Sequence, residues 1–252
     1  MLFVLSFIFG AIVGSFLNVC IFRIPAGKSI AYPPSHCPKC DSPIRGYDNI
    51  PIISYLILMG KCRNCKERIS FRYPLVEFLT ALFSLATMIM FGPSVAYLIY
   101  FAFVASLIVI TFIDLDHQII PDIISLPGIP LGFLASFVLP EITYKESLIG
   151  IVIGGGLLLL VAIGYEFIAK KEGMGGGDVK LLAMIGAFLG WKGALFTIFS
   201  GSLVGTIVGV TMMVAQGKDS KYAIPFGPFL SMGALLYLFF GEPIIYWYLG
   251  II

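Results

Sequence analysis

The chain has 252 residues, which is enough for one large or two small soluble domains. Its composition excludes both, because 59% of the residues are hydrophobic and only 12% are charged, whereas a soluble protein carries about 25% charged residues. The mean hydropathy is +0.99. The net charge of +2 says little, because in a membrane protein the position of each charge matters more than the sum. We therefore expect an all-α, polytopic membrane protein in a lipid bilayer.

Apolar runs of the length that crosses a bilayer recur along the chain. We expect about eight transmembrane helices, near residues 2–22, 74–92, 95–113, 123–140, 147–169, 179–191, 193–215 and 226–249. The sixth run is short and contains glycine, so its limits are the least defined. The first run lacks a basic start and a cleavage site, which favours a retained helix over a cleaved signal peptide.

One long polar segment separates the first helix from the rest. It divides the chain into helix 1 (1–22), a polar segment (23–73) and a seven-helix core (74–252). Nine of the 16 Lys and Arg residues lie in the polar segment, so the positive-inside rule places it in the cytoplasm. Alternation of the helices then puts 14 of the 16 on that side, leaving only Lys145 and Lys192 opposite. Both termini are accordingly predicted to be extracytoplasmic.

Two C-x-x-C pairs lie in the polar segment, formed by Cys37, Cys40, Cys62 and Cys65. Such pairs, separated by about 20 residues, are typical of zinc bound by four thiolates. The cytosol disfavours disulfides, and a redox motif would not need two copies. A site closed by four sulfurs has no open position for substrate, so we expect structural Zn²⁺ that helps a small, proline-rich segment to fold.

Two acidic stretches follow apolar runs and emerge on the predicted cytoplasmic side. One begins at Asp114 and continues through Asp116 and Asp122; the other ends at Asp178. Ionisable residues at a membrane boundary are candidates for function. Three chemistries fit them: a carboxylate pair that shares a proton, as in aspartic proteases; proton or cation transport; or a divalent metal held by Asp and His. For Asp116 and Asp122, helix capping or a solvated loop charge is the simpler interpretation.

Glycines precede Asp178 at positions 173, 175, 176 and 177. They permit unusual backbone angles and close approach of another chain, so we expect Gly175, Gly176 and Gly177 to form a substrate loop. The segment lacks the G-x-x-x-x-G-K-[ST] pattern of nucleotide-phosphate loops, and no nucleic-acid partner is expected.

Glu77 opens the second apolar run and has two interpretations. Pro74 is expected at the first helical position, which would place Glu77 in the first turn, where the helix dipole favours a carboxylate. Alternatively, Glu77 takes part in binding, as a candidate cofactor residue. The sequence leaves both open.

These motifs together resemble the bacterial type IV prepilin peptidases, which combine a leader peptidase with an N-methyltransferase. The resemblance covers nearly the whole chain. It rests on Gly14-Ser15-Phe16-Leu17-Asn18-Val19, Arg23-Ile24-Pro25, the doubled C-x-x-C segment, Arg72-Tyr73-Pro74-Leu75-Val76-Glu77, the stretch from Asp114-Leu115-Asp116 to Pro121-Asp122, and Gly175-Gly176-Gly177-Asp178-Val179-Lys180.

The resemblance implies that Asp114 and Asp178, the latter in the family's G-x-G-D element, form the catalytic pair of an aspartic peptidase. It implies cleavage of the basic leader of type IV prepilins and of type II secretion pseudopilins at the cytoplasmic face of the inner membrane. It also implies methylation of the new N-terminus from S-adenosylmethionine, by the polar segment. The alternative from another class is a proton- or cation-coupled transporter that uses the same aspartates. The sequence does not indicate an oligomeric state.

Overall fold

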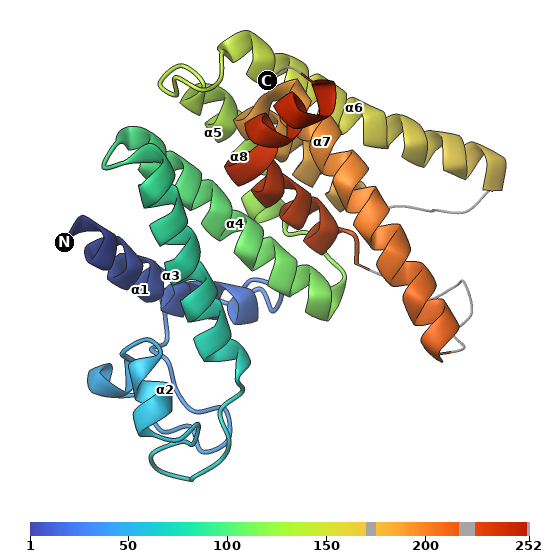
Figure 1. Ribbon diagram of the computed structural model, residues 1–252. Coiled ribbons are helices and arrows are strands. Elements are labelled where there is room, and N and C mark those ends of the chain that lie inside the picture. Colours follow the sequence, from blue (N-terminus) through green and yellow to red (C-terminus); the bar gives the residue numbers. More distant parts are fainter. Residues whose placement is uncertain (170–174, 217–224, 251–252) are drawn as a thin grey trace. The chain divides into compact units, whose positions relative to one another are not determined.

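The structure is a computed structural model that describes residues 1–169, 175–216 and 225–250. Most of these residues form helices; the others lie in loops, turns and two isolated β-bridges in the polar segment. The elements are α1 (Leu2–Arg23), the 3₁₀-helix η1 (Gly46–Asn49), α2 (Ile53–Ile57), α3 (Arg72–Phe91), α4 (Val95–His117), α5 (Asp122–Ala135), α6 (Tyr144–Ala169), α7 (Gly176–Gln216) and α8 (Gly227–Leu249) (Figure 1). The expected all-helical class is confirmed for the part of the chain that is described.

Within the part of the chain that the structure describes, five helices are long and apolar enough to cross a membrane: Leu2–Arg23, Arg72–Phe91, Val95–His117, Tyr144–Ile168 and Gly176–Ala215. Two further apolar helices, Asp122–Ala135 and Gly227–Gly241, are shorter. A multi-pass membrane protein is thus supported, whereas the number of about eight spans stays a prediction.

Helix α7 is interrupted near its middle. Gly190 has φ 71° and ψ −178°, so the 41-residue element consists of two helices joined at a kink. Glycine adopts positive φ without the steric cost that a side chain would impose. The break lies two residues before position 192, where the sequence separates the two predicted apolar runs.

The chain divides into two compact units, Met1–Val109 and Ile110–Ile252, with the boundary inside α4. In the first unit, α1 packs against α3. A Cβ atom on Gly14 would lie 2.7 Å from the Glu77 Cα, so glycine is needed for the two backbones to approach. The buried Ser6 and Ser84 hydroxyls lie 3.0 Å apart, and Ser84 also pairs with the Tyr97 hydroxyl at 2.8 Å. These bonds satisfy polar groups that burial would otherwise leave unpaired.

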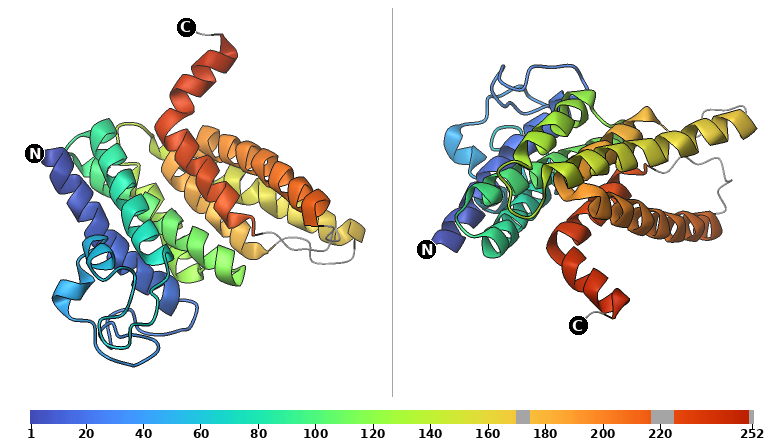
Figure 2. Two further views of the ribbon diagram at one scale, coloured as in Figure 1. Left: turned by 60° about the horizontal axis from the view of Figure 1, so that its bottom comes forward. Right: turned by 90° about the horizontal axis from the view of Figure 1, so that it is seen from above.

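In the second unit, α7 packs against α5, α6 and α8 (Figure 2). Gly150 of α6 faces Gly186 of α7 so closely that a side chain on either would meet the other backbone. The Ser147 hydroxyl donates to the Ala187 carbonyl at 2.7 Å, which adds a polar contact between the same helices. Small residues and interhelical hydrogen bonds are the usual means of helix packing in membranes. They fix α7, whose first turn carries Asp178.

The start of α3 differs from the prediction. The helix begins at Arg72 with Phe71 at the N-cap, so Pro74 is its third residue and Glu77 lies beyond the first turn. The first-turn interpretation of Glu77 is therefore wrong. Proline fits here because the N–H groups of the whole first turn lack a helical partner, and not only the one at the first position.

Candidate functional site

Asp114 lies in the last turn of α4, and only 4% of its surface is exposed. Its Oδ2 atom accepts a hydrogen bond of 2.9 Å from the backbone N–H of Gly227, the first residue of α8. A Cβ atom at Gly227 would lie 2.7 Å from the same oxygen, so this approach needs glycine. The positive end of a helix dipole also favours a negative charge at this place.

Asp178 is the third residue of α7 and is half-buried. Its backbone N–H bonds to the Gly175 carbonyl at 3.2 Å, which forms the first turn of the helix. The carboxyl groups of Asp114 and Asp178 interact electrostatically. The two acidic residues singled out in the sequence, 64 positions apart, therefore come together within one unit.

Ile120 separates the first turns of α7 and α8. A Cβ atom on Gly177 would lie 2.9 Å from the Ile120 Cβ, and one on Gly227 would lie 3.4 Å from its Cδ1. Gly177 thus makes room for this side chain. Among the described residues, no atom lies within 4 Å of the place of a Cβ on Gly176, and the nearest to that of Gly175 is the Gly177 nitrogen at 4.0 Å. Gly173 lies outside the described residues.

Asp122 and Lys180 tie α5 to α7 beside this site. The Lys180 ammonium lies 2.8 and 2.9 Å from the two carboxylate oxygens of Asp122. Asp122 is the first residue of α5 and Pro121 is the N-cap, so Asp122 starts the helix but does not cap it. Asp116 and His117 are exposed at the end of α4. The pair with Lys180 gives Asp122 a structural role outside the carboxylate pair.

The four cysteines of the C-x-x-C pairs converge, with every sulfur within 4.8 Å of the others. The sulfurs of Cys37 and Cys65 are 3.8 Å apart. A tetrahedral zinc with Zn–S bonds of about 2.3 Å separates its sulfurs by about 3.8 Å, whereas a disulfide requires about 2.05 Å. The cysteines are free thiols. This donor set fits a metal ion that cross-links the segment.

Each C-x-x-C pair lies on a small hairpin, and the two hairpins repeat the same hydrogen bonds 25 residues apart. Cys37 N–H bonds to the Ser42 carbonyl at 3.0 Å, and Cys62 N–H to the Glu67 carbonyl at 2.8 Å. The residue after each second cysteine has positive φ, namely Asp41 (52°) and Lys66 (58°). The isolated β-bridges His36–Pro43 and Lys61–Arg68 are likewise 25 residues apart. The segment is thus a pair of matching knuckles that present two sulfurs each.

The Cys40 thiol is prepared for metal binding by its neighbour. The Ser42 hydroxyl lies 3.0 Å from the Cys40 sulfur, and this hydrogen bond is the main cause that lowers the pKa of Cys40 to about 6. The thiolate is the form that binds metal. On the second knuckle, Arg63 donates to both carboxylate oxygens of Asp48, the shortest bond being 2.7 Å, and so fastens the knuckle to η1.

Glu77 fastens the polar segment to the helices of the first unit. Its buried carboxylate accepts the Ile52 N–H at 2.7 Å, and the Ser15 side chain also hydrogen bonds to it. Ile52 has φ 63° and ψ −51°, and the Ile53 N–H bonds to the Pro51 carbonyl at 2.6 Å, which makes a tight turn. Positive φ is strained for a β-branched residue, so the carboxylate holds a conformation that the chain would not adopt alone.

Gly227 belongs to the site but is not among the residues predicted from the sequence. The signal was present in Pro225-Phe226-Gly227-Pro228, because a proline next to the first position of a helix marks its start. What the pattern does not reveal is the partner, since Asp114 lies 113 residues earlier.

Known proteins support the resemblance stated for the sequence. Residues 8–91 match the bacterial peptidase A24 N-terminal domain, and residues 101–210 match the type IV leader peptidase family. The prepilin leader peptidase/N-methyltransferase of Aeromonas hydrophila is 36% identical over 98% of this chain and 93% of the relative. The proteins of that name from Pseudomonas aeruginosa and Neisseria gonorrhoeae are each 38% identical, over 97% and 90% of this chain and 92% and 87% of their own lengths. No solved structure matches significantly. With both parts of the chain matched and relatives covered almost from end to end, this chain belongs to the type IV leader peptidase family.

Proposed function

We propose that this protein is a membrane aspartic peptidase that removes the basic leader of prepilins or pseudopilins, and that it then methylates the new N-terminus from S-adenosylmethionine. The observation that carries the peptidase activity is the meeting of Asp114 and Asp178 at adjoining helix ends. The curated relatives are named as prepilin leader peptidases and N-methyltransferases.

In the proposed hydrolysis the two carboxyl groups share one proton and flank a water molecule. Two carboxylates that repel each other in a poorly solvated site do not both stay ionised. The ionised group takes a proton from water as the water oxygen attacks the scissile carbonyl, and the protonated group donates to the carbonyl oxygen. Collapse of the tetrahedral intermediate breaks the C–N bond and returns a proton to the leaving amine.

We assign the negative charge to Asp114 and the shared proton to Asp178. The Gly227 N–H and the first turn of α8 stabilise a carboxylate at Asp114, because a hydrogen bond to the charged form and a helix N-terminus both favour that form. Asp114 is then the group that activates water, and Asp178 is the group that polarises the carbonyl.

The substrate is proposed to approach along the start of α7. The described residues leave the place of a side chain at Gly175 and Gly176 unfilled, which supports an extended substrate backbone lying against the turn that carries Asp178. The apolar helix that follows the leader in a prepilin would lie among the membrane helices. The scissile bond then meets the aspartates at the boundary between membrane and cytoplasm.

The distribution of Lys and Arg supports an active site that faces the cytoplasm, with both termini on the opposite side of the inner membrane. The transporter alternative expects acidic residues near the middle of a span, whereas Asp114 lies in the last turn of α4 and Asp178 in the first turn of α7.

For the polar segment we propose zinc held by Cys37, Cys40, Cys62 and Cys65, as a structural cross-link between the two knuckles. We propose that this segment serves the methyltransferase activity and that Glu77 is its candidate residue for the methyl donor. A carboxylate has acceptor capacity beyond the bonds from Ile52 and Ser15, and the methyl donor carries positive charges that it would attract.

The test is mass spectrometry of a type IV prepilin co-expressed with the wild-type protein, with Asp114→Asn or with Asp178→Asn. The wild type should yield a pilin without its leader and with one added methyl group. Each variant should leave the leader in place at normal expression in the membrane. Continued processing by both variants would remove the carboxylate pair as the catalytic centre.

A further inference from the structure

The short helix α2 presents its apolar side chains outward. Ile53, Leu56 and Ile57 share one face of the helix, and Met59 follows them; these four side chains are between 54 and 84% exposed. The polar Ser54 points inward, where its hydroxyl donates to the Tyr47 carbonyl at 2.9 Å. An apolar face of this kind in a soluble segment marks a surface that is covered by something else.

The position of α2 on α3 indicates what covers it. Ile52, directly before α2, bonds to Glu77, which is five residues into the membrane-spanning helix α3. At a rise of about 1.5 Å per residue, the start of α2 therefore lies about 7 Å along α3 from its first residue. Phe78, the residue after Glu77 in α3, is also apolar and exposed, so the surface of α3 around this attachment point is apolar. That surface belongs at the depth where the bilayer begins.

Two aromatic side chains lie where α2 meets the start of α3. The rings of Tyr55 in α2 and Phe71 before α3 are 6.4 Å apart in an edge-on arrangement, and Phe71 is largely exposed. Aromatic side chains with a polar group, such as Tyr, are enriched where membrane meets water.

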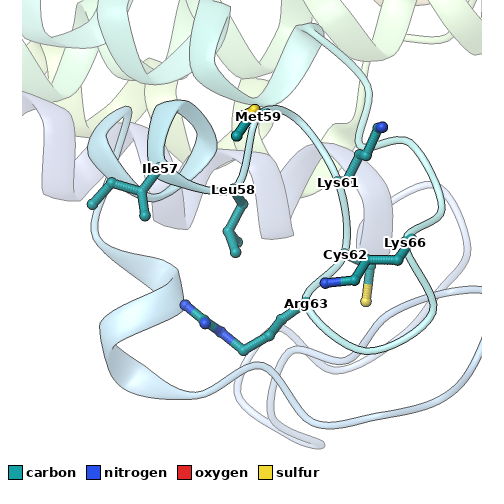
Figure 3. A pocket seen from close by; sticks show the side chains of 7 residues that line it. All are labelled: Ile57, Leu58, Met59, Lys61, Cys62, Arg63 and Lys66. Carbon is teal, nitrogen blue, oxygen red and sulfur yellow. The ribbon is translucent and has the colours of Figure 1, made fainter.

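A hollow of about 350 Å³ follows α2 and has two kinds of wall. Ile57, Leu58 and Met59 form the apolar wall, and Lys61, Arg63 and Lys66 bring positive charge, with Cys62 between them (Figure 3). Leu58 projects into the hollow, and Lys66 and Arg63 flank it (Figure 3). Because Arg63 is paired with Asp48, the two lysines supply the charge available to a ligand. An apolar surface beside cations complements an anionic amphiphile.

We propose that α2 and the turn Met59–Lys66 form an anchor in the adjacent membrane leaflet. Lipid acyl chains lie against Ile53, Leu56, Ile57 and Met59, and the headgroup of an anionic phospholipid is held at Lys61 and Lys66. The anchor fixes the level of the cysteine knuckles relative to the bilayer. This inference depends on the first unit alone and on neither of the proposed activities.

Single tryptophans test the depth of the anchor in the full chain. The two native residues, Trp191 and Trp247, are replaced by Phe, and a reporter is introduced as Leu56→Trp or Ile57→Trp. The matched control is Lys39→Trp, which is exposed on the first knuckle of the same segment. Each variant is reconstituted into vesicles whose phosphatidylcholine is brominated on the acyl chains. Both α2 reporters should be quenched several-fold more strongly than the control; equal quenching at all three positions overturns the proposal.

Charge is tested in the same vesicles with and without phosphatidylglycerol. The anionic lipid should increase quenching of the Leu56→Trp reporter, and Lys61→Gln with Lys66→Gln should abolish that increase. Lys28→Gln with Lys39→Gln removes the same charge elsewhere and should leave the increase intact. If the lipid has no effect, and only an added prepilin N-terminal peptide alters the reporter, the face binds substrate and the lipid anchor is rejected.

Discussion

Asp114 accepts a hydrogen bond of 2.9 Å from the backbone of Gly227, at the first turn of the last helix. This bond joins the end of α4 to the start of α8 across 113 residues and aims a helix N-terminus at the buried carboxylate. The bond requires glycine at position 227, because the Asp114 oxygen occupies the space that a side chain there would take. The glycine thus belongs to the proposed peptidase site although it carries no reactive group.

Gly227→Ala should therefore lower leader cleavage strongly. The new Cβ would lie 2.7 Å from the Asp114 Oδ2, so the carboxylate or the start of α8 must move. Displacements of about 1 Å in an active site cost on the order of 100-fold in rate. The measurement is the cleavage rate of a prepilin in membranes, with Gly164→Ala in α6 as the control, because that glycine has open space around it. An unchanged rate in Gly227→Ala would show that the Asp114–Gly227 contact is not needed.

The sequence was sufficient for the parts of this site that follow from local chemistry. Asp114 and Asp178 stand out because carboxylates are costly at the edge of apolar runs, and the cysteines stand out by spacing. The Asp114–Gly227 bond and the Ile120 packing depend on which helix ends meet, which the pattern of one chain does not encode. The tight turn at Ile52 could not be predicted either. The backbone preference of isoleucine opposes a positive φ, and the hydrogen bond to Glu77 overrides that preference.

Helix boundaries likewise differ in how well the local sequence predicts them. Two separate apolar runs, 179–191 and 193–215, are expected from the sequence, with the limits of the first poorly defined; the structure joins them in α7 with a kink at Gly190. Helix α3 starts two residues before Pro74, because proline is compatible with any position in the first turn and so does not fix the first residue of the helix.

The ion pair between Asp122 and Lys180 should support cleavage without adding much stability. Both side chains are partly exposed, 55% and 36%, and exposed pairs contribute about 0–1 kcal/mol. Lys180 lies two residues after Asp178, so Lys180→Asp is expected to lower the cleavage rate several-fold with little change in thermal unfolding. The exchanged pair Asp122→Lys with Lys180→Asp should recover most of the rate. Failure of the exchange to restore cleavage would indicate that Lys180 acts on the substrate instead.

Zinc should be found at about one ion per chain and should depend on the knuckles. Structural zinc contributes about 10 kcal/mol or more to the folding of small zinc modules. The double variant Cys62→Ser with Cys65→Ser should therefore lose zinc, as measured by elemental mass spectrometry, and should be cut readily by trypsin between residues 24 and 71. Cys20→Ala, which alters the fifth cysteine in α1, should keep both zinc and resistance.

Loss of zinc should reduce methylation before it reduces cleavage, because the aspartates belong to the other compact unit. Mass spectrometry of the processed pilin separates the two activities in one sample. Full methylation by a zinc-free variant would argue against a structural metal in this segment.

Variants of Glu77 can distinguish a role in attaching the polar segment from a role in binding the methyl donor. Glu77→Gln keeps an acceptor for the Ile52 N–H but removes the negative charge, so the segment should stay attached and resist trypsin. If the carboxylate also attracts the positively charged methyl donor, methylation should fall at least about 10-fold, the loss of roughly one charge-assisted hydrogen bond. Leader cleavage should stay unchanged.

Glu77→Ala is the companion variant, because it removes both the charge and the acceptor. It leaves the Ile52 N–H unsatisfied, at a cost of about 1–3 kcal/mol, and releases the strained turn before α2. The segment should then become sensitive to trypsin as well as inactive in methylation. Normal methylation in Glu77→Gln, together with its loss in Glu77→Ala, would assign Glu77 to attachment alone, because the two variants differ in the acceptor and share the missing charge.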